Sequence, residues 1–120
     1  MIRLDLKREP HWLDLGHGVR VHARPCSTAL VMAARAAAAR ANVGVPIDDE
    51  ASVGLRTAAL VKALARLAVD DWEGVGDTEG KPVAVTPEGL DALLDLWPIA
   101  EAFERNYLGP ALLLDAEKNV

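Results

Sequence analysis

The chain has 120 residues, of which 51% are apolar and 4% aromatic, and its formal net charge is −5 at pH 7. This length fits one domain with a core of its own, and the apolar fraction excludes a disordered chain. The absence of a membrane-spanning run and of a secretory signal, together with a single cysteine, Cys26, predicts a cytoplasmic protein without disulfides.

The N-terminal residues 2–24 alternate apolar and polar side chains, a pattern typical of half-buried strands. The alternation runs over residues 2–7, stops at Pro10, and resumes on both sides of a glycine turn at residues 16–18. We predict a hairpin or a small three-stranded meander here, with an apolar face that helices must cover.

Two helices are predicted next. Ser27 or Thr28 can cap the first, which we expect to end near Asn42. Its predicted buried face is narrow and alanine-rich, comprising Leu30, Ala33, Ala34, Ala37 and Ala41. Asp48 or Asp49 can cap the second helix, which we expect to end near Val69. Its apolar side chains recur at helical spacing at Val53, Leu60, Val61, Leu64, Leu67 and Ala68.

Residues 70–86 hold three glycines, a proline and several acids, which indicates an ordered loop or small hairpin, with Trp72 as its anchor. Thr86-Pro87-Glu88 has the cap, proline and acid typical of a helix start. A further helix should follow Trp97-Pro98, and a final turn or two should lie within residues 111–118. The whole chain is therefore predicted to be one α+β, mainly α domain: a hairpin or small sheet over residues 2–24 packed on four to five helices within residues 27–118.

No arrangement of reactive side chains indicates an enzyme, a metal site or a cofactor. The histidines at positions 11, 17 and 22 and Cys26 do not have the spacing of a zinc site, and no nucleophile elbow accompanies them. The carboxylates and glycines of residues 70–86 are better explained as loop residues than as a calcium or phosphate site. A small enzyme that uses Cys26 or a histidine stays as an alternative, because a helix N-terminus can activate a thiol.

The charges are divided between the two parts of the chain. Residues 1–45 carry seven Lys or Arg and three Asp or Glu. Residues 46–120 carry six Lys or Arg and fifteen Asp or Glu. The basic part includes Arg20, Arg24, Arg35 and Arg40, but the acidic part would repel phosphates, so we expect no nucleic-acid partner. The two parts are better suited to pack against each other or against neighbouring copies.

Several motifs resemble those of tail assembly chaperones of long-tailed bacteriophages and prophages. In chain order they are Trp12-Leu13-Asp14-Leu15-Gly16-His17-Gly18-Val19-Arg20-Val21, Arg24-Pro25 before an alanine-rich helix, Trp72-Glu73-Gly74-Val75, Gly80-Lys81-Pro82, Val85-Thr86-Pro87-Glu88, Leu93-Leu94, and the stretch from Phe103 to Tyr107. The likeness covers most of the chain. Ala84, where a second proline or polar residue is common, and the helix-weakening Gly89 depart from the pattern.

The resemblance implies a small, acidic, mainly helical factor in the bacterial host cytoplasm that self-associates and has no catalytic residues. Such a factor holds the tape-measure protein while the tail tube polymerises, and its partners are the tape-measure protein, the tail tube protein or both. The candidate partner contacts are Trp72, Trp97, Leu112, Leu113, Leu114, Arg35 and Arg40. The main alternative is a structural virion protein, such as a head–tail connector.

Overall fold

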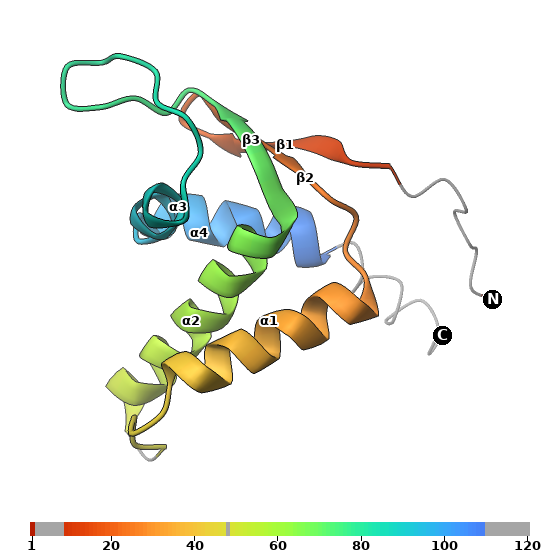
Figure 1. Ribbon diagram of the computed structural model, residues 1–120, viewed down its shortest axis with the longest axis vertical. Helices are drawn as coiled ribbons and strands as arrows, with labels where there is room; N and C mark the ends of the chain where they lie inside the picture. The colour runs from red at the N-terminus through yellow and green to blue at the C-terminus, as the bar shows by residue number, and fades with distance from the viewer. Residues whose placement is uncertain (2–8, 48, 110–120) are drawn as a thin grey trace.

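The computed structural model (Figure 1) describes residue 1, residues 9–47 and residues 49–109. The elements follow in the order β1 (His11–Gly16), β2 (Val19–Ala23), α1 (Thr28–Ala41), α2 (Glu50–Ala68), β3 (Val69–Glu73), α3 (Pro87–Leu94), α4 (Trp97–Phe103) and the π-helical segment η1 (Glu104–Leu108). An antiparallel sheet of order β1-β2-β3 packs on these helices. The predicted α+β, mainly helical fold class is therefore confirmed.

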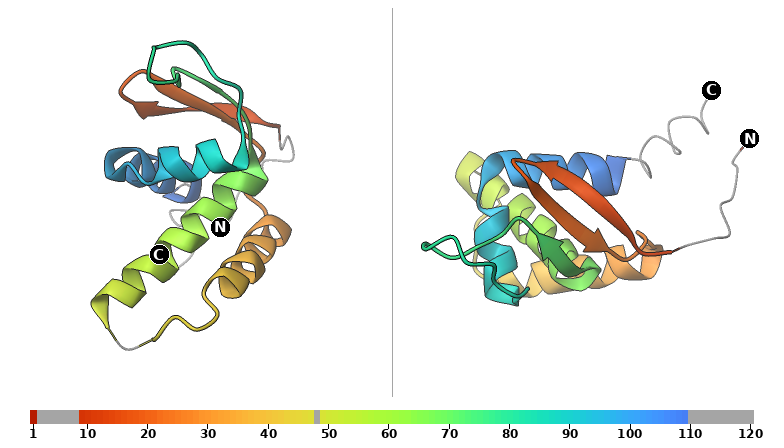
Figure 2. Two further views of the ribbon diagram at one scale, coloured as in Figure 1. Left: turned by 60° about the vertical axis from the view of Figure 1, so that its left-hand side comes forward. Right: turned by 90° about the horizontal axis from the view of Figure 1, so that it is seen from above.

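The helices lie on one side of the sheet, with α3, α4 and η1 next to it and the α1–α2 pair further away (Figures 1 and 2). α4 and η1 pack against β1, and α3 packs against α2 and α4. α2 runs directly into β3 and carries α1 alongside it, so that the α1–α2 pair extends away from the sheet. The core lies where the sheet meets α2, α3 and α4, and Phe103, Leu64 and Val21 are its largest fully buried side chains.

The β1–β2 hairpin forms as the alternation predicts. Its inward side chains are buried, namely Leu13, Leu15, Val19, Val21 and Ala23. His17 and Gly18 connect the strands with φ angles of 56° and 77°, as a type I′ turn requires of both central residues. The other predicted strand, over residues 2–7, lies outside the described residues.

The third strand of the sheet is β3, which the sequence had placed in the loop over residues 70–86. A bulge explains the difference. His22 pairs with Asp71 and Ala23 with Val69, so Asp70 is the extra residue. The bulge places Val69 and Trp72, three positions apart, on the buried face, and this spacing removes the period of two that identifies strands. The prediction of a loop is wrong for residues 70–73, which belong to β3, whereas Gly76 and Pro82 do form a small hairpin bridge beyond this strand.

The caps of the first two helices act as predicted. The side chain of Ser27 accepts a hydrogen bond from the Leu30 amide at 3.2 Å, and Asp49 accepts one from the Ser52 amide at 2.7 Å. The hydrogen bond from the Ser52 backbone amide and, to a smaller extent, one from the Ser52 side chain lower the pKa of Asp49. Asp49 therefore stays ionised at the positive end of the α2 dipole at neutral pH.

The buried faces of α1 and α2 differ in part from the prediction. Ala34 and Ala38 are the buried residues of α1, whereas Ala33 and Ala41 are exposed. In α2, Val53 and Leu67 keep 53% and 39% of their surface exposed, although both were expected in the core. Among the described residues, α1 and α3 leave part of α2 uncovered, so its apolar stripe extends past the surface that these two helices bury.

The C-terminal helices begin where proline punctuation predicts. Thr86 caps α3 through its hydroxyl, which accepts a hydrogen bond from the Gly89 amide at 2.9 Å, and Pro87 opens the helix. α4 begins at Trp97, as expected, and continues into η1. The predicted final turns over residues 111–118 lie outside the described residues.

Tyr107, the only tyrosine of the chain, should make stability depend on alkaline pH. Its hydroxyl donates to the Arg24 carbonyl at 2.8 Å, and burial, with a smaller effect of the Cys26 charge, raises the pKa of Tyr107 from 10.0 to about 12. A raised pKa in the folded state contributes stability that is complete below pH 10 and is lost as the pH rises through about 12.

We expect Tyr107→Phe to lower the free energy of unfolding by about 1 kcal/mol at neutral pH, because one buried hydrogen bond is lost. The variant should also lose less stability than the wild type between pH 10 and about 12. Urea denaturation over a pH series measures both effects. Parallel pH curves for the two proteins would contradict this prediction.

Candidate partner-binding site

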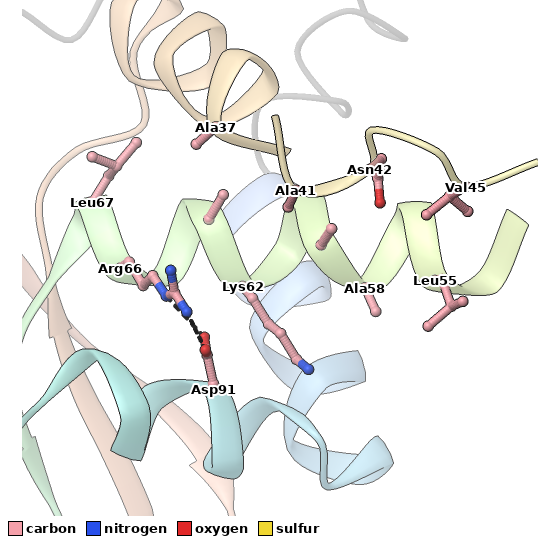
Figure 3. Close-up of a pocket in the computed structure, with 12 residues that line it drawn as sticks. Ala37, Ala41, Asn42, Val45, Leu55, Ala58, Lys62, Arg66, Leu67 and Asp91 are labelled. Atoms are coloured by element: carbon pink, nitrogen blue, oxygen red, sulfur yellow. Dashed lines mark hydrogen bonds and ion pairs between the residues drawn. The ribbon is translucent and has the colours of Figure 1, made fainter. Parts of the chain in front are cut away.

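An apolar groove runs between α1 and α2 and is bounded on one side by α3 (Figure 3). Its volume is about 430 Å³. Most of its lining is apolar: Ala37, Ala41, Val45, Leu55, Ala58, Ala59, Ala63 and Leu67. Such a shape suits the apolar face of a helix or a row of apolar side chains from another protein.

Alanines on the two helices create the groove. Two of the lining alanines, Ala37 and Ala41, belong to α1. The other three belong to α2: Ala58, Ala59 and Ala63. Each side chain ends at Cβ, so the helices pack closely at their buried residues and leave space where their surfaces diverge. Leu55 lies beside this space and keeps 61% of its surface exposed, so the groove presents apolar surface to solvent.

Two ion pairs hold α3 against the polar side of the groove. Arg66 makes two hydrogen bonds with the Asp91 carboxylate, of which Nε to Oδ1 measures 2.9 Å. The hydrogen bond with Asp91 raises the pKa of Arg66, so this pair stays charged at physiological pH. One helical turn away, Lys62 Nζ lies 2.6 Å from Asp95 Oδ1. These contacts connect α3 to α2 beside the groove.

The structure distributes the predicted contact residues over separate surfaces. Arg35 and Arg40 are exposed on α1, and Trp97 is 74% exposed at the start of α4. Trp72 is only 7% exposed, and its Nε1 donates to the Val83 carbonyl at 2.7 Å, so it belongs to the core. Leu112, Leu113 and Leu114 lie outside the described residues.

The groove itself was not predicted as a site. Ala37 and Ala41 belong to the alanine-rich face that the sequence predicted for this helix, and α2 is the helix that packs beside it. Leu55 and Ala58 carried no distinguishing pattern. Leu67 was assigned to the core because its spacing fits the amphipathic stripe of α2.

The histidines do not form a common centre. His11 begins β1, His17 lies in the turn at the other end of the hairpin, and His22 donates from Nδ1 to Asp70 at 2.6 Å. His22 also contacts the Trp12 ring, with ring centroids 5.2 Å apart. Among residues 9–47 and 49–109, no three His, Cys, Asp or Glu side chains are grouped in a way that could hold a metal ion.

The sequence matches a known protein family. Residues 25–119 match the family model of the YdaY prophage protein. The chain belongs to this prophage family. Comparisons with curated proteins and with solved structures gave no match. The matched range contains every residue that lines the groove, whereas the β1–β2 hairpin precedes it, so the groove is part of the family's shared sequence.

Within the part of the chain that the structure describes, no helix combines the length and the apolar character needed to cross a membrane.

Proposed function

We propose that this prophage protein is a non-enzymatic tail assembly chaperone in the bacterial host cytoplasm, which binds the tape-measure protein through the α1–α2 groove. The groove is the observation that carries the proposal. It offers exposed apolar surface between two helices, and it lies within the sequence that matches a prophage family. The likeness of the sequence motifs to tail assembly chaperones supports the same function.

The chemistry of the groove fits such a partner. A tape-measure protein is a long, largely helical and apolar chain that would aggregate if left uncovered. A helix can place one apolar face in a groove of this kind, where alanines admit its larger side chains. Each contact is small, but many copies on one long partner would hold it firmly through avidity.

Co-expression tests the proposal. The protein should be produced with the longest helical protein encoded beside it, and that neighbour should become soluble and co-elute with many copies of the chaperone. If the neighbour is not retained and the protein instead stays in purified particles, the head–tail connector is favoured and the chaperone proposal fails.

A variant that fills the groove links this result to the site. Ala58→Trp should weaken retention of the neighbour about tenfold, equivalent to about 1.4 kcal/mol of binding free energy. Ala51→Trp is the matched control, because Ala51 is exposed on the same helix but does not line the groove. Equal retention by the two variants would exclude the groove as the binding site.

A further inference from the structure

The side of α1 that faces away from α2 is apolar as well. Met32, Ala36 and Ala39 follow one another at helical spacing, and Val43 continues the row just beyond the end of the helix. All four are exposed, with Met32 at 50% and Val43 at 82%. We call these four residues, with Arg35 and Arg40, the α1 outer face. Among the described residues, no helix or strand covers it.

The charge at this face is positive only. Arg35 flanks the apolar row on one side and Arg40 flanks it on the other. Neither arginine forms an ion pair within the described residues. No Asp or Glu occurs between Gly16 and Ile47, so no acid in the neighbouring sequence compensates them. A partner for the α1 outer face should therefore combine an apolar centre with acidic flanks.

The junction between α3 and α4 has that composition. Leu96 and Trp97 are 56% and 74% exposed, and Pro98 is exposed next to them. Asp95 precedes these residues, and Glu101 lies one helical turn after Trp97 on the same side of α4. Residues 87–108 contain five acids and one arginine, so the field around this α3–α4 corner is negative.

A hollow of about 450 Å³ lies beside the corner. Leu96 and Pro98 border it, and Val19, Leu93 and Ile99 are among its other apolar lining residues. A methionine side chain adapts its shape to such irregular apolar spaces. Met32 of the α1 outer face is the long, exposed apolar side chain that fits this role.

We propose that the α1 outer face of one copy binds the α3–α4 corner of a second copy. Met32 enters the hollow beside Trp97, and Arg35 and Arg40 face the acids around Glu101. Because the two surfaces are different, the contact is head-to-tail, and a pair of copies keeps one free α1 outer face and one free α3–α4 corner. The groove lies on the opposite side of α1, so a row of copies leaves every groove open.

Sedimentation velocity over a concentration series tests this contact on the protein alone, independently of any tape-measure binding. The wild type should associate reversibly, and added salt should weaken the association because exposed charges contribute to it. Arg35→Glu combined with Arg40→Glu, or Trp97→Ala alone, should each weaken self-association about tenfold or more.

Mixing the two variants gives the decisive result. The Trp97→Ala protein keeps an intact α1 outer face and the double arginine variant keeps an intact corner, so the mixture should form a 1:1 dimer and nothing larger. Thermal unfolding checks that each variant is folded, and Ala39→Glu replaces the arginine variant if that protein is unstable. A monomeric wild type, unaffected variants, or a mixture without the dimer would each overturn the proposal.

Discussion

Replacement of Gly74 by alanine will destabilise the protein by about 3 kcal/mol or more, because strain and a backbone clash occur together. A Cβ atom at this position would lie 2.0 Å from the carbonyl oxygen of Gly18 and 2.8 Å from its carbonyl carbon. Both are backbone atoms of the β1–β2 turn, so no side chain can move aside. Gly74 also has a φ of +81°, which L-residues with a side chain rarely adopt.

Gly80→Ala is the matched control for this prediction. Its φ of +79° is nearly the same, but an added Cβ would meet nothing within 4 Å. We therefore expect only the conformational cost, about 1–2 kcal/mol. Urea denaturation of both variants separates the clash from the strain. Equal losses would show that the close approach of Gly74 to Gly18 does not limit stability.

The features that could be predicted from the sequence are local. The alternation of residues 13–23, the glycine turn, and the caps at Ser27 and Thr86 each depend on neighbours within a few residues, and the structure has all of them. The third strand could not be predicted in this way. Its identity depends on pairing with β2 across more than 40 residues of sequence, and the bulge at Asp70 hides its alternation.

The candidate site depends on which apolar surfaces the fold leaves uncovered, and periodicity alone does not contain that information. Leu67 and Val53 follow the same helical pattern as the buried Leu64, yet they stay exposed because no helix or strand within the described residues covers them fully. The charge division was visible in the sequence. Its placement on an exposed helix face and on the corner around Trp97 required the structure.

Gly89 shows how a local rule can mislead. In the sequence it only weakens the helix that Thr86 starts. In the structure, a Cβ on Gly89 would lie 2.8 Å from the Trp72 ring, so the glycine allows the indole to pack against α3. A glycine inside a helix at this point is a consequence of the buried tryptophan on β3.

Replacement of Trp72 should destabilise the protein strongly, whereas replacement of Trp97 should leave its stability almost unchanged. Trp72→Ala should lower the free energy of unfolding by about 3–5 kcal/mol, because it empties a buried site and leaves the Val83 carbonyl without the indole donor. Trp97→Ala should change it by no more than about 0.5 kcal/mol, since its side chain is 74% exposed.

Equilibrium unfolding in urea, followed by circular dichroism, measures both variants. If the two stability changes are as expected, a loss of partner binding by Trp72→Ala would result from unfolding. A binding or assembly defect of Trp97→Ala would instead show that Trp97 makes a surface contact with a partner. A stable Trp72→Ala protein would contradict the assignment of Trp72 to the core. In that case Trp72 would return to the group of residues whose role in binding must be tested directly, because removing it would not disturb the fold.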